Sequence, residues 1–247
     1  MDLIKVKTAQ GISTIKLSRP KVNAINESLV DELIMSFSGL KNRSDVKSIL
    51  LTGEGSFLSF GFDIPEFLNY SKDEFRVFVE KFCKLLNEIF LFPKPVLSGI
   101  NGHAIAGGCL LALACDYRIM VEDRAKIALN ELTFGSTVFP IGISILKYTV
   151  GTRNAEIMLE RGGMYSANQA KEIGLIDKSA PLEKFDDLVE ETLGEYSNKD
   201  PLAFSDLKYN LRKNVIEKDN DFDINRFIDI WYSDSTWNNL QNIKIKD

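Results

Sequence analysis

The stretch "GINGHAIAGGCLLALACDYRIM", residues 99–120, carries the strongest information about the fold. Gly107 and Gly108 precede small and apolar residues, a pattern that predicts a helix from about Gly107 to Ala114. Glycines at a helix start permit either tight packing of the helix on a strand or close approach of a charged group to the backbone. The second interpretation has a physical basis, because the first N–H groups of a helix have no intrahelical acceptor and lie at its positive end.

On both sides of this stretch, strands alternate with helices. A strand in "STIKLSRP" ends at Pro20, and Asn26 is the expected N-cap of the next helix. The strand "KSILLTGEG" precedes a helix that begins with Ser71 and Glu74 at capping-box spacing. "PVLSGING", "DYRIMV" and "KIAL" are further expected strands, and short helices are expected at "NAEIMLERG" and "SANQAKEIG". After Pro181 the sequence is almost purely helical.

This order of elements predicts an α/β fold with an α-helical region at its C-terminal end. We divide the chain into a core over 1–190, which would hold the active site, and a helical region over 191–247. The helical region has too many large apolar side chains for a free surface helix. We expect these residues to pack on the core or on another subunit: Phe222, Phe227, Ile228, Trp231 and Trp237.

Composition and charge exclude several classes of protein. The 247 residues carry a net charge of −5, which argues against a nucleic-acid-binding surface. No apolar run approaches the ~20 residues that span a bilayer, and "MDLIKVKTAQ" lacks the apolar core of a signal peptide. The three cysteines lie within apolar patterns and predict buried thiols, so we expect a soluble cytoplasmic protein with no membrane partner. The cysteines lack metal-ligand spacing and His103 is the single histidine, so no metal site is expected.

A second glycine turn lies in "SFLSFGFDIPEF", residues 56–67, after the strand "KSILLTG". Pro65 is placed near the first turn of the helix that is expected to follow. An oxyanion hole usually takes two donors, and two glycine turns that both lead into helices could supply them from the backbone. Each turn taken alone is more often structural, so the order of the motifs carries the argument.

The order "RPKVNAIN", "ILLTGEGSFLSFGFD", "KPVLSGINGHAIAGGCLLALACDYRI" and "ALNELTFG" resembles the crotonase family, the enoyl-CoA hydratases and isomerases, over nearly the whole chain. The resemblance implies a spiral of ββα units with a C-terminal α-helical trimerisation region, and hence a homotrimer or a dimer of trimers. It also implies an acyl-CoA substrate whose thioester oxygen lies between the N–H groups of Phe62 and Gly107. By the same resemblance, further residues would lie along the substrate or its CoA: Val22, Ala24, Phe60, Gly61, Asp63, Ile64 and Gly108.

The number of acidic residues expected in the site distinguishes the reactions of this family. Hydratases of the family have two glutamates, and this chain has Leu110 at the first position and Glu131 at the second. Adding water requires a site that activates water and also delivers a proton, a task that two carboxylates share. Moving a double bond from the 3,4 to the 2,3 position needs no water and one base, which removes the α proton and returns it at the γ carbon.

The sequence therefore predicts a 3,2-enoyl-CoA isomerase in which Glu131 shuttles the proton and Leu110 helps to exclude water. "GGCL", "LNE" and the tail "FIDIWYSDSTWNNLQNIKIK" are also similar to the mitochondrial-type isomerases of the family. CoA would be part of the substrate, so no separate cofactor is expected.

Several alternatives stay open at this level. They are another crotonase-type reaction, such as hydration, hydrolysis or decarboxylation, a carrier-protein thioester as substrate, and a catalytically silent protein of this fold. Asp63 is more often a helix cap than a catalytic acid, and His103 is more often a packed residue than a substrate contact. Phe134 and Phe139 are candidates for the acyl pocket.

Overall fold

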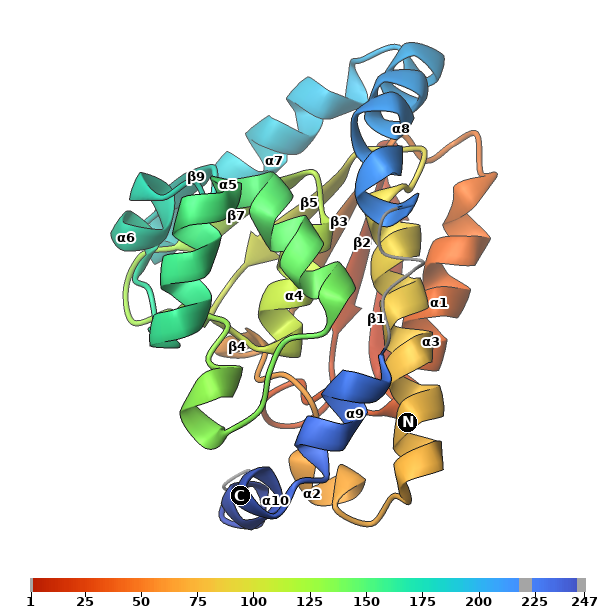
Figure 1. The fold of residues 1–247 in the computed structure, drawn as a ribbon. Coiled ribbons are helices and arrows are strands. Elements are labelled where there is room, and N and C mark those ends of the chain that lie inside the picture. Colours follow the sequence, from red (N-terminus) through yellow and green to blue (C-terminus); the bar gives the residue numbers. More distant parts are fainter. Residues whose placement is uncertain (1, 218–223, 244–247) are drawn as a thin grey trace.

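The computed structural model describes residues 2–217 and 224–243, and its centre is a six-stranded sheet with the order β1-β2-β3-β5-β7-β9 (Figure 1). The first two strands form an antiparallel hairpin, and the remaining neighbours are parallel. The strands are β1 (Ile4–Ala9), β2 (Ile12–Leu17), β3 (Ser48–Gly53), β5 (Val96–Ile100), β7 (Tyr117–Val121) and β9 (Lys178–Ala180).

A second, smaller parallel sheet contains β4 (Phe57–Ser59), β6 (His103–Ile105) and β8 (Ile127–Ala128). Each of its strands directly follows a strand of the larger sheet along the chain. The chain therefore winds through repeated strand–strand–helix units, and the predicted spiral of ββα units is confirmed. The short strands end next to the two glycine turns, so the smaller sheet positions both turns.

Local sequence explains the starts of two long helices that lie side by side, α1 (Glu27–Lys41) and α3 (Lys72–Phe90) (Figure 1). The Leu29 N–H donates to the Asn26 side chain at 3.0 Å, so the predicted N-cap is confirmed. Ser71 and Glu74 form the predicted capping box in both directions. Both helices bury one apolar face, which fixes their positions against the core.

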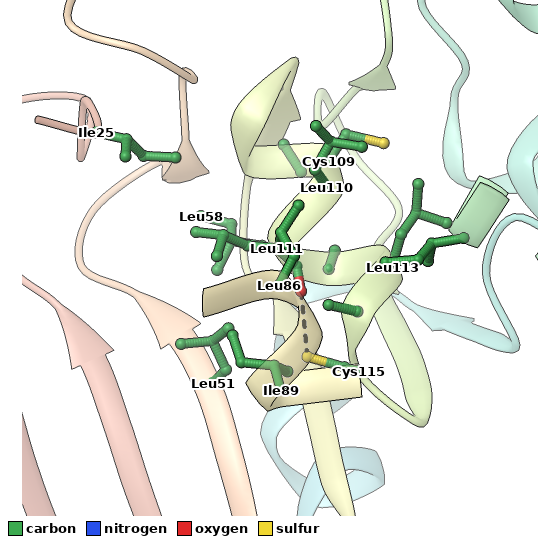
Figure 2. Close-up of a cluster of buried hydrophobic side chains, with 14 of the residues drawn as sticks. Ile25, Leu51, Leu58, Leu86, Ile89, Cys109, Leu110, Leu111, Leu113 and Cys115 are labelled. Atoms are coloured by element: carbon green, nitrogen blue, oxygen red, sulfur yellow. Dashed lines mark hydrogen bonds between the residues drawn. The ribbon is translucent and has the colours of Figure 1, made fainter. Parts of the chain in front are cut away.

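The predicted helix in the opening stretch is α4 (Gly107–Ala114), and all of its residues are buried. Figure 2 shows Leu110, Leu111 and Leu113 of this helix among other buried apolar side chains. A Cβ atom on Gly108 would lie 2.4 Å from the Ser59 carbonyl oxygen, so only glycine lets α4 pack this closely on β4. The packing interpretation of the glycine pair is therefore correct for Gly108.

The helix in the "NAEIMLERG" segment begins earlier than expected. α5 (Pro140–Arg161) consists of two helical parts joined at Gly151, whose φ of 75° and ψ of 162° interrupt the helix. The sequence pattern identified only the second part, because the glycine separates the two apolar faces. α6 (Ala167–Glu172) agrees with the expected helix in "SANQAKEIG".

The C-terminal part is helical as predicted, with α7 (Leu182–Ser197), α8 (Pro201–Glu217), α9 (Asn225–Trp231) and α10 (Asp234–Leu240). The division expected at residue 190 lies within α7. α8 is joined to the core by a buried ion group, in which the Asp116 carboxylate lies 2.7 Å from Lys208 Nζ and 3.0 Å from Arg212 Nη1. None of the described helices is long and apolar enough to cross a membrane.

α9 returns to the lower end of α3 in the view of Figure 1. Phe227, Ile228 and Trp231 on this helix are buried in the core, which was one of the two positions expected for them. Trp237 is half-buried and stacks on Tyr232, with ring centroids 5.0 Å apart. Phe222 lies outside the described residues.

Candidate active site

A cavity of about 400 Å³ opens between the two glycine turns, a short helix at Glu131, and the C-terminal helices. Its walls are mainly aromatic and aliphatic, and they come from six separate segments of the chain. The lining residues are Phe60, Phe62, Ile64, Ile105, Ala106, Gly107, Leu110, Asn130, Glu131, Thr133, Phe134, Thr137, Phe139, Met164, Phe227, Trp231 and Ile243. An apolar cavity with a few polar groups is the usual form of a small-molecule site.

The turn after β4 supplies one free backbone donor. The Ile25 N–H donates to the Gly61 carbonyl at 2.7 Å, and the Asp63 N–H donates to the Ile25 carbonyl at 2.9 Å. These two bonds flank Phe62 and leave its N–H without a backbone acceptor in the part of the chain that the structure describes. α2 (Ile64–Phe67) follows at once and is capped by the Asp63 side chain.

The start of α4 supplies the second donor. Gly107 is the first residue of the helix, so its N–H has no intrahelical acceptor. The preceding Ala106 has a φ of 49°, which is unfavourable for a residue with a side chain and costs about 1–3 kcal/mol. The Ala106 N–H donates to the Ala128 carbonyl at 2.8 Å, and this bond holds the unusual turn in place.

The two donor turns lie directly against each other. Gly61 has a φ of 101°, and a Cβ atom there would lie 3.3 Å from the Gly107 nitrogen and 2.9 Å from the Ile105 carbonyl oxygen. A Cβ atom on Gly107 would lie 3.2 Å from the Phe62 ring. Glycine at both positions therefore lets the two turns pack this closely beside one cavity, so the Phe62 and Gly107 N–H groups are candidates for the two donors of an oxyanion hole.

Glu131 is the first residue of the 3₁₀-helix η1 (Glu131–Phe134), and its side chain lines the same cavity. The residue is only 9% exposed, and its Oε2 atom has no hydrogen-bond partner among the described residues. Burial disfavours the charged form and raises the pKa of this carboxyl to about 7. A carboxyl with that pKa can both accept and donate a proton near neutral pH.

Leu110 lines the same cavity as the two donor turns and Glu131, and it is 2% exposed. It lies on α4 among buried hydrophobic side chains (Figure 2) and packs against the start of α5 next to Gly142. Among the described residues that line the cavity, Glu131 is the only acid. The site thus combines two neutral donors, one acid and an apolar wall.

The residues expected along the substrate fall into two groups. Phe60, Phe62, Ile64 and Gly107 line the cavity, as do the acyl-pocket candidates Phe134 and Phe139. The others do not line it: Val22, Ala24, Gly61, Asp63 and Gly108.

The second group supports the donor turns. The Phe60 N–H donates to the Val22 carbonyl at 2.9 Å, and the Arg19 guanidinium binds both the Ala24 carbonyl and the Asp63 carboxylate. Asp63 is therefore a cap and an ion-pair partner. His103 lies outside the cavity, with its ring 4.9 Å from that of Phe57.

The C-terminal wall was missed at the sequence level. Phe227 and Trp231 lie four residues apart on α9 and face the cavity together. Trp231 stacks on Phe75 with ring centroids 4.5 Å apart, and Phe227 contacts Phe139 edge to face at 5.4 Å. Their i, i+4 spacing was a usable signal for one shared face, but nothing in the sequence identified what that face would contact.

This fold and this site define a crotonase-fold enzyme, in which two glycine turns and a buried acid line one cavity. The chain belongs to the enoyl-CoA hydratase/isomerase family, whose model matches residues 7–227.

Relatives named as hydratases and relatives named as isomerases are both similar to the chain. It is 31% identical to a probable enoyl-CoA hydratase of Bacillus subtilis over 222 residues, covering 87% of this chain and 84% of the relative. It is 28% identical to the human mitochondrial enoyl-CoA delta isomerase 1 over 251 residues, covering 97% of this chain and 81% of the relative.

Solved structures confirm the fold. The crystal structure of human mitochondrial delta3-delta2-enoyl-CoA isomerase superposes with a TM-score of 0.91 at 26% identity, covering 97% of this chain and 96% of that chain. An enoyl-CoA hydratase from Bacillus halodurans superposes with a TM-score of 0.89 at 21% identity, covering 98% and 100% of the two chains.

Proposed function

We propose that the protein is an enoyl-CoA isomerase that moves a 3,4 double bond to the 2,3 position. The observation that carries this proposal is the acid inventory of the cavity. Glu131 is the only acid among its described lining residues, and Leu110 occupies the wall position where a second carboxylate would assist water addition. One acid is sufficient for a proton shuttle, whereas hydration uses two.

The proposed reaction begins with the thioester carbonyl oxygen between the N–H groups of Phe62 and Gly107. The Glu131 carboxylate removes a proton from C2, and the electron pair of that C–H bond forms a dienolate whose negative oxygen the two donors stabilise. The double bond shifts to C2–C3, and the Glu131 carboxyl returns the proton to C4. The substrate and product have the same atoms, and no group is oxidised or reduced.

The raised pKa of Glu131 suits both steps. A carboxylate whose pKa lies near 7 is a stronger base than an exposed glutamate, so removing a proton from C2 is less unfavourable. The protonated form is also populated near neutral pH and can deliver the proton to C4. Burial is the dominant cause of the shift, so the apolar walls that hold the acyl chain also tune the base.

The apolar walls favour isomerisation over water addition in a second way. A dienolate beside ordered water could be protonated by that water, and an apolar wall at Leu110 prevents this.

The relatives include hydratases and isomerases at comparable identity, so the side chains of the site support the choice of isomerase more than overall similarity does. The proposed proton transfer requires no metal or redox group, and CoA is part of the substrate.

The test offers the protein two substrates of equal chain length, 3-hexenoyl-CoA and 2-hexenoyl-CoA, and follows the products by absorbance and chromatography. We expect 3-hexenoyl-CoA to become 2-hexenoyl-CoA, and no 3-hydroxyhexanoyl-CoA to form from either substrate beyond the uncatalysed rate. Formation of the hydroxy product as the main product would assign the chain to the hydratases instead.

A further inference from the structure

A second cavity, of about 160 Å³, lies on the other side of Glu131 from the substrate cavity. It is enclosed by the end of β8, η1 and the loop that leads into α5. Its lining residues are Leu129, Glu131, Leu132, Ser136, Thr137, Val138, Ile143, Leu159 and Glu160. Glu131 and Thr137 line both cavities, so these two residues are part of the partition between them.

Two polar side-chain atoms in this partition have no protein partner among the described residues. They are Oε2 of Glu131 and Oγ of Ser136, and both atoms are buried. Ser136 is 1% exposed, and its N–H donates to the Glu131 carbonyl at 3.0 Å, which fixes the serine one short turn beyond the glutamate. The two side chains form no hydrogen bond with each other, and buried polar atoms are usually satisfied by the protein or by ordered water.

Water fits this position in size and chemistry. A cavity of 160 Å³ far exceeds the roughly 10–15 Å³ that one water needs, and buried water is stable where two to four polar groups can bind it. The Ser136 hydroxyl, the Glu131 carboxyl and the Thr137 side chain are such groups. The Glu160 carboxylate at the edge of the cavity is exposed and connects it to bulk solvent.

We propose that the second cavity holds water that exchanges the proton of Glu131 with bulk solvent while substrate occupies the first cavity. In this exchange the protonated Glu131 carboxyl donates its proton to a bound water and receives a different proton from that water, so no net charge moves. Ser136 acts through Glu131 and does not line the substrate cavity. It is a positioning residue that holds the water next to the carboxyl.

Two fates therefore compete for a proton that Glu131 has taken from the substrate. A proton taken from C2 either returns to the substrate directly or is first replaced by a solvent proton through the second cavity. An acyl chain in the first cavity would cover the side of Glu131 that lies at the apolar walls. Exchange of the Glu131 proton with solvent during a catalytic cycle would then depend on the side at the second cavity. This inference rests on the proposed function in one respect, which is that a proton from the substrate must reach Glu131.

The experiment measures deuterium that enters the substrate from heavy water. Wild type, Ser136→Ala and Leu159→Phe are incubated with 3-hexenoyl-CoA, and mass spectrometry gives the deuterium incorporated per double bond moved. Leu159→Phe narrows the cavity from α5 without removing a polar group. Ser98→Ala is the matched control, because Ser98 Oγ is also buried without a protein partner but lies on β5 and lines neither cavity.

We expect deuterium per turnover to fall about tenfold in Ser136→Ala and Leu159→Phe, and to match wild type in Ser98→Ala. A merely structural defect would lower turnover and leave this ratio unchanged. Wild-type ratios in both cavity variants, or no solvent deuterium in the wild-type product, would overturn the inference.

Parallel incubations with hexanoyl-CoA separate this inference from the isomerase proposal. This saturated thioester can exchange α protons but has no double bond to move. Wild type that exchanges these protons without isomerising 3-hexenoyl-CoA would end the isomerase proposal alone. The same variants on hexanoyl-CoA would then decide the inference, which predicts slower α-proton exchange in Ser136→Ala and Leu159→Phe than in Ser98→Ala.

Discussion

The two ends of the substrate cavity are built in different ways. The donor end consists of backbone: two glycine turns that contain Phe62 and Gly107 pack against each other, and short hydrogen bonds hold the turns. The aromatic end consists of side chains from distant parts of the chain, with Phe139 before α5 and Phe227 and Trp231 on α9. Backbone donors depend on local conformation and tolerate little change, whereas an aromatic wall depends on total volume and can be remodelled.

The difference predicts that substitutions at the donor end abolish chemistry, while those at the aromatic end change which substrate is used. Glu131 acts together with the backbone donors in the proposed chemistry. Its pKa, however, is raised by burial among the apolar walls, so its function depends on both ends of the cavity.

The largest effect is expected for Glu131→Gln. The amide keeps the shape of the side chain but cannot accept the C2 proton, so kcat should fall by about 10³-fold or more. Binding of hexanoyl-CoA, measured by calorimetry, should change by less than about threefold, since the donors and walls remain. Glu156→Gln on the exposed side of α5 is the matched control. Turnover near that of wild type would exclude Glu131 as the base.

The same substitution should stabilise the fold at alkaline pH. The Glu131 pKa rises from 4.5 to about 7 on folding, so the native state holds this proton more tightly than the unfolded state. The contribution of this more tightly held proton to the free energy of unfolding is complete below about pH 4.5. It is lost as the pH rises through about 7. Glu131→Gln should therefore raise the free energy of unfolding by about 3 kcal/mol at pH 8.

Urea unfolding at two pH values checks this second prediction. The advantage of Glu131→Gln should shrink to less than about 1 kcal/mol at pH 5, which lies only about half a pH unit above the unfolded-state pKa of 4.5 and well below the native pKa of about 7. An equal difference at pH 5 and pH 8 would mean that Glu131 is not held in a neutral, buried form.

Gly61→Ala tests the backbone donors. Its φ of 101° is strained for alanine, and the new Cβ atom would lie 2.9 Å from the Ile105 carbonyl oxygen, so the Phe62 N–H must move. We expect kcat/KM to fall about 10²-fold, the typical effect of losing one oxyanion donor. Gly39→Ala is the control, because Gly39 lies within α1 with no atom near its added Cβ, and it should be stabilising and fully active.

The pH profile follows from the same pKa. Removal of the C2 proton requires the Glu131 carboxylate, so kcat/KM should rise about tenfold per pH unit below about pH 7 and level off above it. The initial rate at low substrate concentration from pH 5 to 9 gives this profile. An inflection near pH 4.5 would indicate an exposed base and contradict the buried site.

The smallest effect is expected at the aromatic end. Trp231→Leu removes an aromatic ring from the cavity wall and should shift the preference among six-, eight- and ten-carbon 3-enoyl-CoA substrates towards longer chains by about tenfold in kcat/KM. Trp237→Leu removes an indole that stacks outside the cavity and should leave the preference unchanged. A general loss of activity in Trp231→Leu, with the preference unchanged, would contradict the contrast between the two ends.

The same contrast explains what could be predicted from sequence. Asn26, Ser71 and Glu74 act on residues within three positions along the chain, and their caps were predicted correctly. The bounds of α4 were also correct, because its apolar run is short and starts at a glycine pair. Gly151 hid the first half of α5, since a break in the apolar pattern does not distinguish a kink from a loop.

The candidate site was predictable in part. Glycine spacing and motif order indicated the donors and Glu131 as candidates, and the structure brings these residues to one cavity. The contributions of Trp231 and Ser136 could not be predicted, because both depend on tertiary packing: α9 returns to α3, and the loop before α5 encloses the second cavity. The raised pKa of Glu131 is likewise a property of burial that no local pattern encodes.

The most direct test of the central claim follows one proton. 3-Hexenoyl-CoA with both C2 hydrogens replaced by deuterium is isomerised in ordinary water, and NMR locates deuterium in the product. If Glu131 alone carries the proton, part of the removed deuterium appears at C4, and this share is larger in Leu159→Phe, where solvent exchange is slowed. Product with no deuterium at C4, from both wild type and Leu159→Phe, would show that different groups remove and return the proton.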